Sequence, residues 1–374
     1  MTKRCPELPL SVDVDLTGEY WFFVRWIITK RQFYLTVCWV FRKLRNRCFR
    51  LFNGYRVYPN ELRVLMLECR DIHDGWSSED NGEIGLGSKA PKSISLAGDE
   101  IAVVKGHVDW LHTFIDREDE ESLHRWNFLL HLIGREKRQI DCLHWAANQI
   151  SEWVGIFQNE IQTQKKGLGK NPRWESYTIS ERLSNSSIFF HVSKIEPSKN
   201  FTSALIDQAQ YLTKHLEYYG DYTGNHIVNN GRGLYLFGVT FDIESFRTLG
   251  KLLLERELPN LVSPAGFVRE GSSHYQFLIT RWVLEVNYFC RKQSDVDFRQ
   301  MIGQYCEKLE DKCRFFMPEN SHSGNNIYPL FGDISPDFPP EWLSDLLTSR
   351  LSCNQQLDHT SSRLPELSWN WIWN

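Results

Sequence analysis

Apolar residues recur at helical spacing through most of the chain between residues 101 and 317. Over 140–157, for example, they return every three or four positions, which places them on one face of a helix. The same spacing predicts further helices, approximately at 104–114, 123–132, 174–192, 202–219, 225–238, 244–261, 273–292 and 296–316. No strand pattern of any length competes within this region. The pattern therefore predicts an all-α domain of antiparallel helical hairpins, arranged as a ring or a solenoid.

The segments on either side of this region have a different pattern. Residues 1–100 are expected to form an N-terminal arm, in which amphipathic helices over 19–52 precede a polar, glycine-rich loop over 70–100. Residues 318–374 contain many loop-forming residues, and we expect them to be a linker and tail. No repeat of fixed period is visible, which disfavours a regular solenoid for the domain over 101–317.

Composition narrows the class of protein. The 374 residues are 41% hydrophobic and 24% charged, which is typical of a globular chain. A formal net charge of −4 argues against nucleic acid as a partner. The nine cysteines are scattered without a CxxC pair, which is typical of free thiols in a reducing compartment.

The N-terminal part shows no signal for export or for membrane insertion. Its first ten residues lack the apolar run of a signal peptide, so a cytoplasmic location is the default expectation. Residues 20–41 are largely apolar but are interrupted by Arg25, Lys30 and Arg31. A membrane-spanning helix needs about 20 mostly apolar residues, so we expect no integral membrane span.

Two polar clusters stand at predicted helix starts, at 222–226 and 269–276, with apolar helices between them. Their side chains can accept, donate and orient protons, as a site on a helical scaffold requires. Each cluster also has a structural interpretation. Asn225 is a good N-cap residue, and Ser273 followed three positions later by Gln276 is a capping box. The tyrosine and histidines of these clusters, taken singly, can equally be core or capping residues.

A third polar cluster covers 174–182. Glu175 and Arg182 are seven residues apart and hence lie on one face of a predicted helix. A solvated face of salt bridges explains this spacing. A wall on which sugars stack, built from Trp174 and Tyr177, explains it equally well.

Other site chemistries find no support in the sequence. The chain has no GxGxxG, P-loop, HExxH or GxSxG motif. The GxG at 231–233 lies within a helical pattern, and His144 falls on the apolar face of its helix. His107 and His112 are five residues apart and do not form a convincing metal pair. We therefore expect neither a metal ion nor a cofactor.

Three motifs, in order along the chain, resemble those of the heparinase II/III-like polysaccharide lyases. They are Trp-Glu-Ser-Tyr at 174–177 with Ser180 and Arg182, Gly-Asn-His at 224–226, and the run at 266–275 that ends in Ser-Ser-His-Tyr. Segments 123–131 and 329–333 also resemble parts of that family. The shared order and spacing cover about residues 20–345.

The resemblance implies an incomplete α/α toroid, usually followed by a β-sandwich, that cleaves acidic, uronic-acid-containing polysaccharides by β-elimination. It implies that Asn225 holds the uronate carboxylate and that Tyr275 is the acid, or the acid and base together. It implies that His226 assists by orienting or accepting a proton. It implies that Glu175, Arg182 and Glu270 position the sugar or Asn225. With Trp174 and Tyr177 as the stacking wall, these are the residues expected to bind substrate.

Two departures from the family pattern keep other functions open. Gln276 stands where the family often has histidine. The chain also ends soon after 329–333, so we expect the β-sandwich, and the further catalytic histidine that it often supplies, to be absent. A non-catalytic glycan-binding domain is therefore one alternative. A toroid glycoside hydrolase is another, because Glu175 and Glu270 could supply the two carboxylates that it needs.

Overall fold

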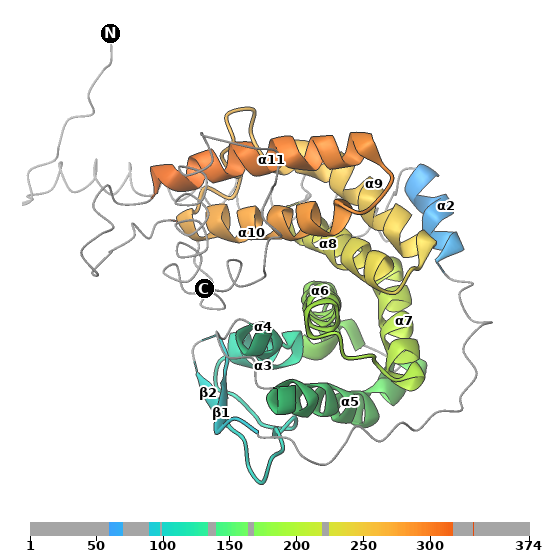
Figure 1. Ribbon diagram of the computed structural model, residues 1–374, viewed down its shortest axis with the longest axis vertical. Helices are drawn as coiled ribbons and strands as arrows, with labels where there is room; N and C mark the ends of the chain where they lie inside the picture. The colour runs from blue at the N-terminus through green and yellow to red at the C-terminus, as the bar shows by residue number, and fades with distance from the viewer. Residues whose placement is uncertain are drawn as a thin grey trace, which may run out of the picture. The chain divides into compact units, whose positions relative to one another are not determined.

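Long helices make up most of the described part of the protein in the computed structural model (Figure 1). The structure describes residues 60–69, 90–97, 99–133, 140–163, 168–218, 224–316 and Gly332. These residues belong to one unit of the chain, Tyr58–Asn374. The amphipathic helices predicted over 19–52, and nearly all of the tail predicted over 318–374, lie outside the described residues.

The described helices confirm the all-α prediction and form an incomplete α/α toroid. They are α2 (Asn60–Glu68), α3 (Arg117–Arg125), α4 (Phe128–Ile133), α5 (Ile140–Gln162), α6 (Ser176–Ser193), α7 (Lys199–Lys214), α8 (Asn225–Thr240), α9 (Glu244–Leu261), α10 (Ser273–Cys290) and α11 (Val296–Phe315). Two short turns of 3-10 helix, η1 (Leu168–Lys170) and η2 (Pro172–Trp174), precede α6. The helices predicted from residue 140 onward are thus confirmed, with small differences at their ends.

Helix α6 is central, and it contacts α3, α4, α7 and α8 (Figure 1). Its residues 176–190 are all buried, although many of them are serines. The hydroxyls of Ser180, Ser186 and Ser187 each donate to the carbonyl oxygen four residues earlier. Because these three hydroxyls are satisfied within the helix, their serines can be buried at low cost.

Helix α8 packs closely on α6 and α9 because glycines lie at both contacts. A Cβ placed on Gly233 would lie 2.8 Å from the carbonyl oxygen of Ser180 in α6. On the other side, a Cβ placed on Gly250 of α9 would lie 2.4 Å from the backbone nitrogen of Tyr235 in α8. No side chain fits at these distances, so the GxG at 231–233 serves helix packing.

The helix predicted over 104–114 is wrong. The chain forms an antiparallel pair of short strands, β1 (Ser93–Ser95) and β2 (Glu100–Ala102), and then runs through turns to α3. Two of the apolar residues that suggested a helix, Val104 and Leu111, are 62% and 67% exposed. Their spacing therefore does not mark a buried helical face.

The helix predicted over 123–132 is interrupted at Trp126, which has a left-handed φ of 60° and separates α3 from α4. The Trp126 ring is fully buried, with its centroid 5.2 Å from that of Trp153 and 6.1 Å from that of Phe201. A left-handed conformation costs about 1–2 kcal/mol for a residue with a Cβ. Burial of the large indole offsets this cost.

His124 is a buried histidine that the fold keeps neutral. It is 1% exposed, and its Nδ1 accepts a hydrogen bond from Nε1 of Trp153 at 3.0 Å. Burial, followed by the charges of Arg173 and Arg182, holds the pKa of His124 well below its ordinary value. The folded protein therefore leaves His124 unprotonated at pH values where the unfolded chain binds a proton.

We expect the free energy of unfolding to fall as the pH is lowered below about 6.5, with His124 contributing up to about 1.4 kcal/mol per pH unit. The sign follows because, in that range, the unfolded state takes up a proton at this residue and the folded state does not. Urea unfolding at several pH values, compared between the parent and His124→Gln, measures the contribution. The same pH dependence in both proteins would show that His124 is not its source.

Candidate functional site

The candidate site lies where helices α6, α8 and α10 begin. The backbone N–H of Asn225, at the start of α8, donates to Oε1 of Glu270 in the loop before α10 at 3.3 Å. The ring of His226 contacts the ring of Tyr177, in the first turn of α6, with centroids 4.8 Å apart. The structure therefore brings together all three polar clusters that the sequence analysis selected. Tyr222 and Thr223 of the first cluster lie outside the described residues.

The start of α8 favours a negatively charged group. Gly224 is the N-cap, so Asn225 stands one position further into the helix than its predicted capping role. The Glu270 carboxylate satisfies the Asn225 N–H and complements the positive end of the helix dipole. The same dipole acts in favour of an anionic ligand beside Asn225, whereas the charge of the Glu270 carboxylate acts against one.

Asn225 and His226 differ in exposure. Asn225 is 6% exposed, so the protein around it restricts its side chain. The His226 side chain is 46% exposed, yet its Nδ1 lies 2.9 Å from Oε1 of Glu217. The imidazole is therefore held at one nitrogen while part of the ring reaches solvent.

Carboxylates gather beside His226. Burial raises the pKa of Glu175 and the charges of Glu121 and Glu217 raise it further, whereas Arg125 and His226 act in the opposite direction. Glu121 itself forms a 2.6 Å ion pair with Arg125. Glu175 accordingly holds its proton to a higher pH than an ordinary glutamate, and in that form it can donate a hydrogen bond.

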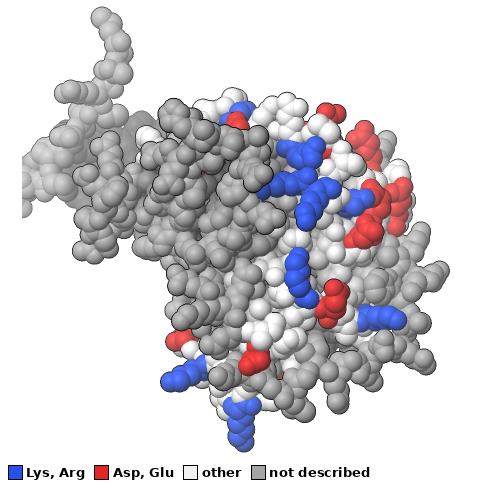
Figure 2. All heavy atoms as spheres, viewed as in Figure 1, with Lys and Arg blue, Asp and Glu red and all other residues white. Residues whose placement is uncertain are grey.

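The wider surface carries both signs of charge. On the face drawn in Figure 2, Lys and Arg side chains are interspersed with Asp and Glu over the described residues. Neither sign of charge therefore covers the described residues of this face alone.

Tyr275 stands in the first turn of α10 and is half-buried. The N-cap is Ser272, whose Oγ accepts a hydrogen bond from the Tyr275 N–H at 3.2 Å. The capping box predicted for Ser273 and Gln276 is therefore wrong by one position. Gln276 instead supports the preceding loop, because its Oε1 accepts from the Val268 N–H at 2.9 Å.

Trp174 and Arg182 lie in the core, with both residues 0% exposed. The Arg182 guanidinium lies 4.3 Å from the ring centroid of Trp153 and 5.4 Å from that of Trp174. Its Nε donates to Oε1 of Gln208 at 2.8 Å. This burial corrects the expectation that Trp174 and Arg182 contact substrate, because a polymer cannot reach either side chain.

Tyr177 does not form an exposed stacking wall either, because it is only 9% exposed. Its ring centroid lies 4.9 Å from the Arg125 guanidinium and 4.8 Å from the His226 ring. Tyr177 therefore supports His226 from the protein side. Of the residues expected to bind substrate, Glu270 is exposed and Glu175 is half-buried, so these two remain candidates for direct contact.

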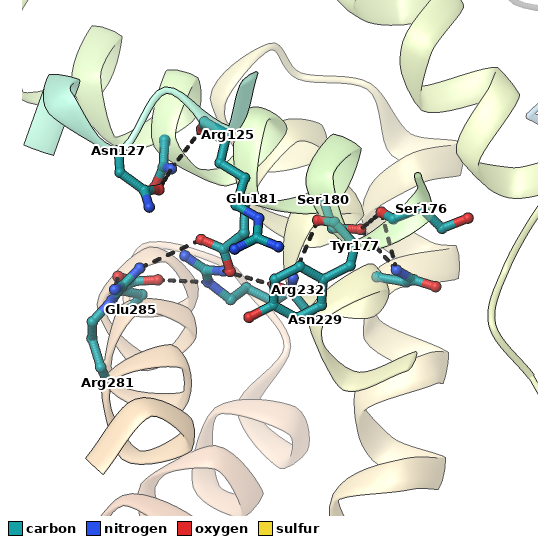
Figure 3. A network of polar contacts seen from close by, with 12 residues as sticks. Arg125, Asn127, Ser176, Tyr177, Ser180, Glu181, Asn229, Arg232, Arg281 and Glu285 are labelled. Carbon is teal, nitrogen blue, oxygen red and sulfur yellow. Dashed lines mark hydrogen bonds and ion pairs between the residues drawn. The ribbon is translucent and has the colours of Figure 1, made fainter. Parts of the chain in front are cut away.

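A buried network of charged side chains joins the three helices (Figure 3). Arg232 of α8 donates to Glu181 in α6 at 2.8 Å and to Glu285 in α10 at 2.6 Å. Arg281 of α10 donates to the other oxygen of Glu285 at 2.8 Å. All four side chains are at most 2% exposed. Burial acts to lower the pKa of Arg232, but the charges of Glu181 and Glu285 raise it above its ordinary value, so the arginine stays charged.

The sequence of this chain matches the model of one known protein family. The family model described as heparinase II/III N-terminus matches residues 98–355. The chain belongs to the heparinase II/III family. A comparison with curated proteins gave no significant match.

One solved structure shows that this heparinase II/III family chain shares the fold of part of heparinase III. The crystal structure of heparinase III aligns with a TM-score of 0.51 at 17% sequence identity, over 83% of this chain and 51% of that chain. The heparan sulfate lyase HepC from Pedobacter heparinus aligns with a TM-score of 0.43 at 18% identity, over 79% of this chain and 47% of that chain. The chain thus spans about half the length of these two structures.

The sequence of this heparinase II/III family chain did not predict two features of the site, namely Glu217 and the buried charged network. Glu217, which pairs with His226, belongs to no motif and carries no signal of its own. The buried network had one signal, since Arg281 and Glu285 are four residues apart in a helix with no other Lys, Arg, Asp or Glu. Both features depend on packing between helices that are distant in sequence.

The described residues contain no cluster of potential metal ligands and no helix suited to span a membrane. Within them, no three His, Cys, Asp or Glu side chains converge as possible metal ligands. Nor does any helix in the described part of the chain have the length and apolar character needed to cross a membrane.

Proposed function

We propose that this chain acts on uronic-acid-containing polysaccharides by β-elimination, with the starts of α8 and α10 forming its active site. The observation that carries the proposal is the hydrogen bond between the Asn225 N–H and Glu270. This bond ties the first residue of α8 to the loop that leads directly to Tyr275. It supports the view that the carboxylate-binding group and the proton-transferring group act together.

Asn225 is proposed to bind the uronate carboxylate. The proton at C5 is weakly acidic because the neighbouring carboxylate is already negative, and removing it adds further charge. Hydrogen-bond donors aimed at that carboxylate stabilise the enolate-like state. The side-chain amide of Asn225 is such a donor, and the N-terminal end of α8 adds a favourable dipole.

Tyr275 is proposed to transfer the proton. In its ionised form its phenolate oxygen takes the proton from C5, the electron pair of that C–H bond forms the C4=C5 double bond, and the C4–O bond breaks. The same tyrosine then returns the proton to the leaving glycosidic oxygen. One residue can serve as base and acid in this sequence, and atoms and charge balance without a cofactor.

We expect Asn225→Ala to lower kcat/KM for elimination by about 100-fold, the cost of losing one donor to a developing oxyanion. The assay follows the ultraviolet absorbance of the unsaturated uronate with heparan sulfate, hyaluronan and alginate as substrates. Asn260→Ala, which removes an exposed asparagine in α9, is the control and should leave the rate unchanged. Full activity in Asn225→Ala would contradict its proposed role.

A further inference from the structure

Glu217 belongs to none of the motifs, yet the protein fixes it at the candidate site. Its backbone N–H donates to Oδ1 of Asn230 in α8 at 3.1 Å. Two residues earlier, the carbonyl oxygen of His215 accepts from Oγ of Ser176, at the start of α6, at 2.6 Å. Asn230 also donates to Oγ of Ser180 in α6 at 2.8 Å. The segment that carries Glu217 is therefore tied to both α6 and α8.

The carboxylate of Glu217 holds one nitrogen of the His226 ring, with Oε1 and Nδ1 2.9 Å apart. An ionised carboxylate can only accept hydrogen bonds, so Nδ1 carries the proton in this pair. The Glu217 side chain is 13% exposed, whereas that of His226 is 46% exposed. The carboxylate thus lies within the protein, and Nε2 is the ring nitrogen left to meet a ligand.

The charges around His226 favour its protonated form. Burial acts to lower the pKa of His226, but the hydrogen bond with Glu217 and the charges of Glu217 and Glu175 outweigh burial and the charge of Arg125. The pKa is therefore raised above its ordinary value. The ring also contacts Tyr177, which adds no full charge. In the imidazolium form both ring nitrogens carry protons, so Nε2 becomes a donor.

We propose that Glu217 is a positioning residue that holds His226 as an imidazolium, so that Nε2–H donates to the uronate carboxylate beside Asn225. The inference rests on the proposed elimination reaction and gives the substrate carboxylate a second donor. That carboxylate gains negative charge as the C5 proton leaves. A cationic donor at the start of α8 stabilises this charge more than a neutral donor does. Glu217 itself acts only through His226.

The protonation of His226 can be measured without an assay of activity. In the full chain with isotope-labelled histidine, the His226 resonances are those lost in His226→Gln. We expect them to titrate above the ordinary histidine value of about 6.5. Glu217→Gln keeps a hydrogen-bonding side chain but removes the charge, so the pKa of His226 should fall. An unchanged titration in Glu217→Gln would overturn the proposal.

The pH dependence of elimination is the second readout. We expect kcat/KM of the parent to fall as the pH rises through the pKa of His226, because the neutral ring loses its Nε2 proton. Glu217→Gln should move this fall to lower pH and reduce kcat/KM about tenfold near pH 7. A merely structural Glu217 would change the rate equally at every pH, and that result would overturn the proposal.

An exposed histidine–glutamate pair elsewhere in the protein supplies the control. Glu152 accepts from His107 at the same 2.9 Å separation, and both side chains are exposed. Glu152→Gln should leave the His226 titration and the pH profile unchanged. If the parent cleaves none of the three glycans, that result contradicts both the elimination reaction and the substrate role of His226. The titration of the His226 resonances then still shows whether the charge of Glu217 raises the pKa of His226.

Discussion

Replacing Tyr275 with Phe is expected to lower kcat/KM for elimination by about 1000-fold or more, because the variant has no group to carry the C5 proton. The phenyl ring keeps the half-buried packing of Tyr275 at the start of α10, so folding should be unaffected. Initial rates of unsaturated uronate formation, measured together with thermal unfolding, separate loss of chemistry from loss of structure. Rates within a few-fold of the parent would show that Tyr275 does not transfer the proton.

Tyr288→Phe is the matched control, since it removes a phenolic hydroxyl from the same helix. The Tyr288 hydroxyl lies 3.4 Å from Nε2 of His191. This variant should keep the parent rate. The Tyr275→Phe variant also distinguishes elimination from hydrolysis. A hydrolase that uses Glu175 and Glu270 as its two carboxylates would remain active without Tyr275.

Arg232→Met is expected to lower the free energy of unfolding by about 3–5 kcal/mol, the usual cost of breaking a buried ion pair. The substitution removes the positive charge between Glu181 and Glu285, which are 2% and 0% exposed at their side chains. Both carboxylates would remain buried with less compensation. Urea unfolding of parent and variant measures the difference.

Arg247→Met tests whether the effect is specific to burial. Arg247 pairs with Asp242 and Glu244, but its side chain is 27% exposed and those of its partners are 94% and 69% exposed. Exposed pairs contribute about 0–1 kcal/mol, so this variant should be close to the parent. Equal losses in Arg232→Met and Arg247→Met would contradict the structural role of the buried network.

The stability of this network bears directly on the proposed site. Arg232 lies seven residues after Asn225 in α8, and Glu285 lies ten residues after Tyr275 in α10. The ion pair between them fixes the two helices whose first turns carry the site. A charged network can hold a particular register between helices even where its net contribution to stability is modest.

The sequence predicted the helices from residue 140 onward because apolar residues recur in them at helical spacing, most regularly in α5. The same reasoning failed over 104–114, where Val104 and Leu111 are apolar but exposed. Spacing alone does not reveal whether a face has a partner to pack against. Helix caps were predicted with a one-residue error, as at Ser272, because neighbouring serines offer equivalent hydroxyls and only the backbone conformation distinguishes them.

The candidate site could be predicted in part. Asn225, His226 and Tyr275 were selected from their motifs, and the structure places them on adjoining helix starts. Trp174 and Arg182 came from the same reasoning but are core residues, because a motif marks a residue type without showing what the side chain contacts. Charged side chains are ordinarily expected at the surface, so the burial of the network appears only once three helices are packed.

The most direct test of the central claim is the chemical identity of the products released by the full chain from a uronate polysaccharide. Elimination adds no water and leaves a C4=C5 double bond at the new end. We therefore predict products that absorb in the ultraviolet and that are lighter by one water molecule than hydrolysis products. Products of the hydrolysed mass, or binding of the glycan without any cleavage, would contradict the proposal.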